Sequence, residues 1–289
     1  AETDKSLVGI TPAMKEGSGM VNFEKEYPER FYDVAIAEQH SVTFAAGLSL
    51  EGLKPVVAIY STFLQRGYDQ FIHDVCLENI DVTFAIDRAG IVGEDGPTHT
   101  GSFDISFMRC IPNIVISCPS NEHELWHLLN ICYEHKGPAA IRYPRGSGIG
   151  VQPIPNEVEG FEIGKAKKIK DGQSVCILNF GVLMDQIDQI AEKKDYTLYD
   201  MRFIKPIDQD ALEHAMQHET IITLEDNTLL GGCGSAVGEK LHKQKFRGNL
   251  LSIGLKDEFP AHGSRNEILR QNGLDEESIQ KTIDDFLRN

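Results

Sequence analysis

Residues that could move protons or bind anions stand at the ends of apolar runs in the first half of the chain. Glu38 closes one such run and directly precedes the apolar helical segment 42–48. A carboxyl in these surroundings could share a proton with a ligand, whereas the plain structural interpretation is an acidic residue in the first turn of a helix. Because ligands of open parallel sheets bind at the carboxyl ends of the strands, Glu38 is the first candidate for chemistry.

The next apolar runs end in aromatic and cationic residues. One is followed by a string that ends in Arg66, the next by the Gly-rich loop 87–101, and the last by Arg145. The loop carries Arg88, acids and a histidine, although a structural turn needs only Gly and Asp. The planar guanidinium group suits phosphate or carboxylate, so these three arginines predict a binding site for an anionic small molecule.

Composition places these residues in an acidic globular protein. The chain has 289 residues, of which 28 are basic and 44 acidic, and its formal charge of −16 excludes nucleic-acid binding as the main function. It contains no apolar run long enough to span a membrane and no leader pattern at its start, so we expect neither membrane insertion nor secretion. Its 6 cysteines form no C-x-x-C pair, which favours reduced thiols and a cytoplasmic location.

The elements that must position these side chains alternate between β-branched runs and segments of helical period. That alternation predicts an α/β fold with parallel sheets. A turn-rich segment near residue 150 interrupts it, so we expect a first domain at 1–150, a linker at 151–161 and a second domain at 162–289. The expected strands are 6–10, 31–36, 55–60, 81–87, 114–117, 139–142, 175–180, 196–201, 220–225 and 249–253, and the main expected helices are 38–51, 62–79, 121–135, 182–194, 208–217, 233–244 and 276–288.

Two local patterns match known site motifs without completing them. Residues 123–127 read His-Glu-Leu-Trp-His, the pattern of zinc proteases, but both histidines fall opposite the apolar face of the helix and are expected to face water. The extended form of that motif also fails, because Asn130 stands where a further Gly would be needed. Residues 231–238 resemble a dinucleotide loop, yet their third glycine comes one residue late, so close packing of a helix on the sheet is favoured.

Longer strings in the same regions resemble one enzyme family. They are residues 33–40, 60–66, 87–101 and 142–146, together with 10–20 near the start and 200–206 in the second half. These strings closely resemble the 1-deoxy-D-xylulose-5-phosphate synthases, which are thiamine-diphosphate enzymes of the transketolase superfamily. The resemblance spans nearly the whole chain. It implies a parallel-sheet pyrimidine-binding domain followed by a transketolase C-terminal-type α/β domain.

The resemblance also implies a reaction and a role for each candidate residue. Members of the family are transferases that condense pyruvate with glyceraldehyde 3-phosphate, losing CO₂, in the synthesis of isoprenoid, thiamine and pyridoxal precursors. Thiamine diphosphate carries the chemistry, and Glu38 would hydrogen-bond N1′ of its aminopyrimidine ring. The match gives Glu38 and His99 catalytic roles, places Phe63 and Arg66 beside Glu38 at the cofactor, and assigns substrate binding to Tyr60, Arg88, Asp95, His99 and Arg145.

The sequence departs from the family pattern in one respect. The family's N-terminal diphosphate-binding domain carries a Gly-Asp-Gly motif that holds Mg²⁺ and the cofactor diphosphate, and that motif does not occur here. The chain also begins abruptly, without Met, a few residues before the first apolar run. We therefore expect a C-terminal portion of a larger enzyme that binds thiamine diphosphate weakly and is inactive alone. Because the family forms dimers, a homodimer is also expected.

Two other functions are compatible with this organisation. A β subunit of a 2-oxo-acid dehydrogenase would consist of the same two domain types and would pair with a separate α subunit. A non-catalytic assembly module would keep the fold without the chemistry. The phosphate-directed Arg88 and Arg145 favour the synthase over the first alternative, and the joint presence of Glu38, Phe63 and His99 argues against the second.

Overall fold

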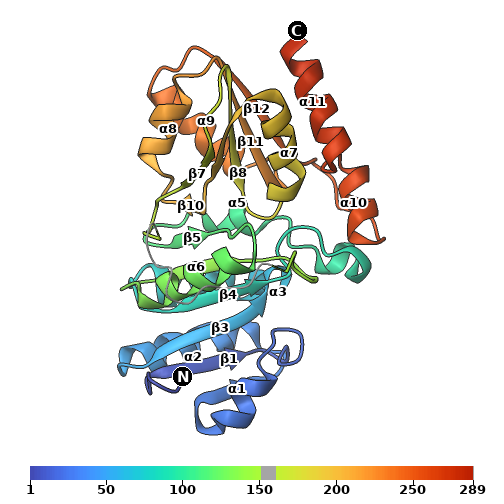
Figure 1. Ribbon diagram of the computed structural model, residues 1–289. Coiled ribbons are helices and arrows are strands. Elements are labelled where there is room, and N and C mark those ends of the chain that lie inside the picture. The colour runs from blue at the N-terminus through green and yellow to red at the C-terminus, as the bar shows by residue number, and fades with distance from the viewer. Residues whose placement is uncertain (151–160, 289) are drawn as a thin grey trace.

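The computed structural model describes residues 1–150 and 161–288, which form two open sheets with flanking helices (Figure 1). The first sheet has seven strands in the order β10-β5-β6-β4-β3-β1-β2. Most neighbours run parallel, so crossover segments must connect them. The strands are β1 (Leu7–Thr11), β2 (Phe31–Asp33), β3 (Lys54–Tyr60), β4 (Thr83–Asp87), β5 (Val115–Ser117), β6 (Ala139–Arg142) and β10 (Phe203–Lys205).

The central strands of this sheet are buried, which explains their apolar sequences. Every residue of β4 and β6 is buried, and parallel strands that are covered on both faces appear in sequence as continuous apolar runs. The edge strand β10 comes from the second half of the chain and pairs antiparallel with β5. The predicted α/β class is confirmed, but the sheet is mixed, because this three-residue strand is too short to leave a recognisable pattern.

Helices fill the crossovers of the first sheet. α2 (Glu38–Leu50) packs on β3, and α6 (Glu122–Glu134) begins at Asn121, whose side chain accepts the Glu124 N–H. The helix predicted at 62–79 is instead a series of short turns with changing winding. Its parts are α3 (Ser61–Leu64), η2 (Gln65–Gly67), α4 (Tyr68–Gln70) and the π-helical η3 (Phe71–Cys76), and the remaining elements are α1 (Val21–Glu26), η1 (Pro28–Arg30), η4 (Gly93–Asp95), η5 (Pro97–His99) and α5 (Asp104–Met108).

The second sheet has five strands in the order β12-β11-β8-β9-β7. Its first four strands are parallel and β7 closes the edge antiparallel to β9. The exposed residues of β7 lack the apolar run that marks a strand in sequence. The elements are β7 (Lys167–Lys170), β8 (Val175–Phe180), β9 (Thr197–Asp200), β11 (Thr220–Thr228), β12 (Asn249–Leu255), α7 (Met184–Lys194), α8 (Gln209–Ala215), α9 (Cys233–Lys243), α10 (Arg265–Gln271) and α11 (Glu276–Arg288).

A shared apolar core joins the two sheets. Its buried members include Ile116 and Cys118 from the first half and Leu178 and Phe180 from the second. Figure 1 accordingly shows β10 and β5 lying at the junction between the halves. The linker predicted at 151–161 lies outside the described residues apart from Phe161, and the two domain boundaries remain predictions. Within the described residues, no helix has the length and apolar character needed to cross a membrane.

Candidate functional site

Glu38 lies at the start of α2 with only 2% of its surface exposed. Its Oε1 accepts a hydrogen bond from Arg66 Nη1 at 3.0 Å. Arg66 reaches Glu38 because η2 packs over α2, where Gly67 lies so close that a Cβ would be 3.1 Å from Val42 Cγ2. Within the described part of the chain no partner is found for Glu38 Oε2. A buried carboxylate with one oxygen still available can bind a donor on a ligand.

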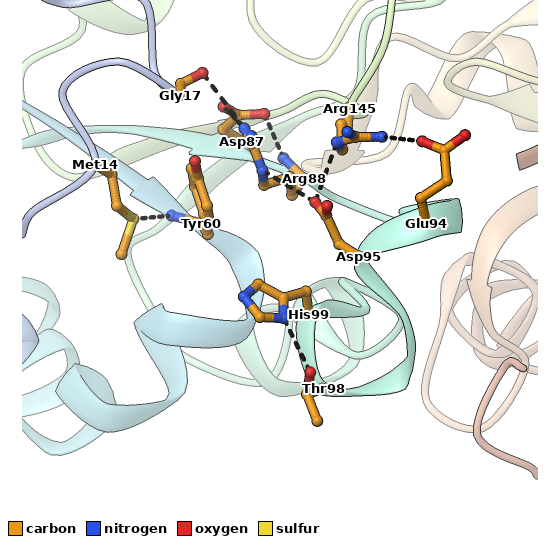
Figure 2. Close-up of polar contacts among 10 residues, drawn as sticks. All are labelled: Met14, Gly17, Tyr60, Asp87, Arg88, Glu94, Asp95, Thr98, His99 and Arg145. Atoms are coloured by element: carbon orange, nitrogen blue, oxygen red, sulfur yellow. Dashed lines mark hydrogen bonds and ion pairs between the residues drawn. The ribbon is translucent and has the colours of Figure 1, made fainter. Parts of the chain in front are cut away.

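An aromatic group extends the site from Arg66 toward the sheet edge. The Arg66 guanidinium carbon lies 5.4 Å from the centre of the Phe63 ring. Phe63 in turn stacks on Tyr60 at 5.8 Å between ring centres and meets the edge of His99 at 5.4 Å. The His99 Nδ1 and the Thr98 hydroxyl lie 2.9 Å apart (Figure 2). Phe63 and His99 are only partly buried, so a planar ring could still contact them.

Two arginines occupy the next part of the same edge. Arg88 stacks over Tyr60 at 3.8 Å and binds Asp87 at 2.6 Å, and Asp95 Oδ2 lies 3.6 Å from Arg88 Nε and 3.1 Å from Arg145 Nε. Figure 2 shows Asp95 between the two guanidinium groups, with Glu94 as the second partner of Arg145 at 2.9 Å. The structure thus joins all eight predicted site residues through successive contacts.

Burial and neighbouring charges shift the pKa values of side chains in this cluster. Burial raises the pKa of Asp87 above its usual value, while the neighbouring Arg88 opposes that shift. Burial also raises the pKa of the Tyr60 phenol, so this hydroxyl stays protonated and can donate to an anion at neutral pH. The bond to Glu94 raises the pKa of Arg145. The cluster therefore presents a neutral donor beside two permanently charged ones.

A buried ion-pair clamp holds the loop that carries Arg88 and His99. Arg142, at the end of β6, binds Asp104 at 2.9 Å and Asp226 of the second half at 2.6 Å, and all three side chains are buried. Asp226 also touches Gly90, whose φ is +69° and where a Cβ would collide with the Asp226 carboxylate. The second half of the chain consequently fixes the start of the 87–101 loop.

The zinc-protease pattern on α6 forms part of the junction between the halves. His127 is buried against the ring of Phe161, with 4.3 Å between ring centres, and Glu124 binds Arg202 Nε at 2.7 Å. The expectation that His127 faces water is wrong, because residues of the second half cover that face of α6. No group of three metal-binding side chains is found among residues 1–150 and 161–288.

The glycine-rich residues 231–238 pack closely, as predicted. Cys233 N–H and Gly234 N–H at the start of α9 donate to the buried Glu225 carboxylate at 2.7 and 2.8 Å. A Cβ at Gly232 would collide with the same carboxylate. The chain's own acid therefore takes the position that a phosphate occupies in a dinucleotide loop.

Some residues of the site were not predicted from the sequence. Asp87 pairs with Arg88 but appears only as the last residue of an apolar strand. Asp226 is distant in sequence, although the polar string 225–227 at the end of an apolar run was a detectable signal. Both residues hold Arg88 or its loop in place.

Family models match both parts of the chain. "Transketolase, pyrimidine binding domain" matches residues 1–149 and "Transketolase, C-terminal domain" matches residues 164–279. The chain is 55% identical over 289 residues to the 1-deoxy-D-xylulose-5-phosphate synthases of Idiomarina loihiensis and of Mannheimia succiniciproducens. In both cases the match covers the whole of this chain but 46% of the relative, so the chain spans about half the length of the curated relatives it matches.

Two solved structures of transketolases also match the chain. A structure described as a split-gene transketolase, an inactive β4 tetramer, matches with a TM-score of 0.86 at 25% identity and covers 98% of this chain and 92% of its own. The transketolase of Campylobacter jejuni matches with a TM-score of 0.76 at 18% identity, over 98% of this chain and 44% of its own. The second match shows the fold alone.

Proposed function

Because the chain belongs to the transketolase family, we propose that it carries the pyrimidine-binding and C-terminal domains of a 1-deoxy-D-xylulose-5-phosphate synthase. The reaction would be the thiamine-diphosphate-dependent condensation of pyruvate with glyceraldehyde 3-phosphate, with loss of CO₂. The buried Glu38, bound to Arg66 and continuous with the Phe63, Tyr60 and Arg88 contacts, is the observation that carries this proposal. The names of the two curated relatives reported above support the synthase over a dehydrogenase subunit or an assembly module.

The residues around Glu38 fit the pyrimidine half of the cofactor. Thiamine diphosphate supplies, when bound, a carbanion equivalent that no protein side chain can provide. Glu38 Oε2 would hold a proton shared with a nitrogen of the pyrimidine ring, and burial would keep water from competing for it. Arg66 orients the carboxylate through Oε1, and the partly exposed face of Phe63 would stack on the ring. His99, at the edge of Phe63, would move or hold a proton on the substrate side.

The arginine cluster fits the phosphorylated acceptor. Arg88 and Arg145 would bind the phosphate of glyceraldehyde 3-phosphate, with the Tyr60 hydroxyl as a neutral donor. Asp95 lies between the two arginines and would meet a substrate hydroxyl once the phosphate takes over the guanidinium contacts. Binding through fixed donors would orient the aldehyde toward the cofactor and pyruvate.

Several properties of the whole protein follow from the same proposal. The diphosphate group and Mg²⁺ would be held by an N-terminal domain outside this sequence, so the chain alone would be inactive, as the similar split-gene transketolase chain is described to be. Domains at 1–150 and 162–289 are supported by the two family-model ranges. A homodimer is supported by the exposed Ile36 beside Glu38, and a cytoplasmic location by six unpaired cysteines.

The test is reconstitution of the reaction from separate parts. The 289-residue chain is mixed with the N-terminal portion of the Idiomarina loihiensis relative, Mg²⁺, thiamine diphosphate, pyruvate and glyceraldehyde 3-phosphate. We expect 1-deoxy-D-xylulose 5-phosphate from the mixture and none from either part alone. Product from the chain alone would refute its proposed inactivity. A folded, associated mixture that makes no product would refute the synthase assignment.

A further inference from the structure

The loop that follows β1, residues 12–20, packs across Tyr60 and Arg88. The sulfur of the buried Met14 accepts the Tyr60 N–H at 3.3 Å. Three residues later, the Gly17 carbonyl oxygen accepts a hydrogen bond from Arg88 Nη1 at 3.4 Å (Figure 2). The loop thus contacts two of the three residues that are proposed to bind the acceptor phosphate.

Gly17 has no room for a side chain. A Cβ at this position would collide with the Tyr60 hydroxyl, and it would lie 2.9 Å from Tyr60 Cζ and 3.2 Å from Arg88 Nη2. The Gly17 backbone lies outside the left-handed region that favours glycine, whereas Gly19 in the same loop has a φ of +71°. The need for glycine at position 17 therefore comes from the space that the Tyr60 hydroxyl occupies.

The Tyr60 ring is held where the collision would occur. It stacks on Phe63, with 5.8 Å between ring centres, and the Arg88 guanidinium carbon lies 3.8 Å from its centre. Arg88 is fixed in turn by its ion pair with Asp87 at 2.6 Å. A side chain at position 17 would therefore push the phenol hydroxyl away from its place beside the guanidinium group.

The loop is held on its own side as well. The Ser18 N–H donates to the Met14 carbonyl oxygen at 2.9 Å, which closes a turn around Gly17. Lys15, inside that turn, forms an ion pair with Glu24 of α1 at 2.9 Å. Because these contacts keep the backbone of the loop in place, the phenol hydroxyl, at the end of a side chain, is the group that yields to a larger residue.

We infer that Gly17 determines acceptor specificity, because its missing side chain leaves the Tyr60 hydroxyl in place as a donor to the acceptor phosphate. This inference rests on the proposed function. Gly17 acts through Tyr60 and is a positioning residue. A side chain at position 17 would weaken the selection of a phosphorylated aldehyde over an unphosphorylated one, since the displaced hydroxyl is used by the first acceptor alone.

The test compares two acceptors in the reconstituted enzyme, glyceraldehyde 3-phosphate and unphosphorylated glyceraldehyde. Gly17→Ala should lower kcat/KM for the phosphorylated acceptor about tenfold, the loss expected for one hydrogen bond to a charged group. Its kcat/KM for glyceraldehyde should stay within about twofold of the wild type. The matched control is Gly238→Ala on α9, where the nearest atom to a Cβ is Leu250 Cδ2 at 3.4 Å, and it should preserve both values.

A double-mutant cycle with Tyr60→Phe tests whether Gly17 acts through the hydroxyl. Tyr60→Phe removes the colliding oxygen and should itself lower the preference for the phosphorylated acceptor. Adding Gly17→Ala to Tyr60→Phe should lower that preference by no more than about threefold further, because the two changes remove the same interaction. Fully additive losses, or an active Gly17→Ala enzyme with the wild-type preference, would overturn the inference.

A second measurement does not depend on turnover. In the 289-residue chain with ¹³Cζ-labelled tyrosine, the Tyr60 signal is assigned by its loss in Tyr60→Phe. That signal should shift in Gly17→Ala and stay in place in Gly238→Ala. An unmoved Tyr60 signal in Gly17→Ala would overturn the inference, whereas a wild-type mixture without product would refute the proposed function.

Discussion

Arg145 offers the sharpest single-residue test of the acceptor site. Its guanidinium holds Glu94 and Asp95 in the structure and is proposed to bind the acceptor phosphate. In the reconstituted enzyme, Arg145→Gln should raise the KM for glyceraldehyde 3-phosphate at least tenfold, because a charge-assisted hydrogen bond to phosphate is lost. Turnover with unphosphorylated glyceraldehyde should stay within about twofold of the wild type. Equal losses with both acceptors would show that Arg145 is structural.

Asp200 predicts a pH-dependent stability. This aspartate is buried in the junction and accepts the Ser120 hydroxyl at 2.5 Å; burial, followed by the nearby Glu124, raises its pKa to about 7. The folded state then keeps a proton that the unfolded state releases above pH 4, so this group's contribution to stability is present at low pH and is lost as pH rises toward 7. Asn mimics the protonated acid at every pH.

The difference between the Tm of Asp200→Asn and the Tm of the wild type should therefore increase by a few degrees in favour of the variant as pH rises from 5 to 8. Thermal unfolding, monitored by circular dichroism at each pH, measures the difference in Tm between the variant and the wild type. The titration of all other groups cancels in this difference. As a control, Asp285→Asn removes a half-exposed acid from α11 and should give a difference that is nearly constant over this range. A constant difference for Asp200→Asn would contradict the prediction.

Individual site residues could be predicted wherever an apolar strand ended in a chemically unusual string. Glu38, Arg88 and Arg145 were found in that way, and their family resemblance added roles that position alone does not give. Their partners were harder to find. Asp226 contacts Arg142 across 84 positions of sequence, and a local pattern holds no information on such a pair. The same limit explains why His127 was wrongly expected to face water, because the ring that covers it belongs to the distant residue Phe161.

At the level of elements, the Arg142 clamp joins β6 to β11 and should carry much of the stability of the junction. Asp226→Asn leaves Arg142 buried with one of its two acids, and breaking a buried ion pair costs about 3 to 5 kcal/mol. Glu239→Gln is the matched control, since Glu239 also pairs across the halves, with Arg109, but its side chain is 64% exposed. That change should cost less than about 1 kcal/mol.

Urea unfolding of the two variants measures the contrast between the clamp and its exposed counterpart. The free energy of unfolding should fall several times more for Asp226→Asn than for Glu239→Gln. Equal losses of unfolding free energy in the two variants would show that burial does not strengthen the ion pairs of the clamp.

Elements with an apolar signature were predicted more reliably than elements without one. Most strands of both sheets and the long helices α2, α6 and α11 agree with the sequence-based ranges to within a few residues. The short edge strands β7 and β10 were not predicted, because they are held by pairing with neighbours rather than by their own residues. The irregular winding of 61–76 was also not predicted, because the segment has the apolar period of one helix although the structure divides it into short turns that pack on α2.

For the whole molecule, the exposed apolar surface beside the site predicts self-association. Ile36 is 76% exposed directly before the start of α2, next to the buried Glu38. We expect the chain to be a dimer or larger by light scattering, and Ile36→Glu to shift it toward the monomer. Leu50→Glu, at the other end of α2 and 73% exposed, should leave the mass unchanged. A monomeric wild-type chain would contradict the prediction.

The central claim is that Glu38 performs proton chemistry on a bound cofactor, and its direct test is turnover of Glu38→Gln in the reconstituted enzyme. Gln keeps the size and the oxygen that faces Arg66 but cannot hold the shared proton, so kcat should fall at least about 100-fold. Glu51→Gln, at the exposed end of the same helix, should keep wild-type turnover. A folded Glu38→Gln enzyme with kcat within about threefold of the wild type would contradict the account.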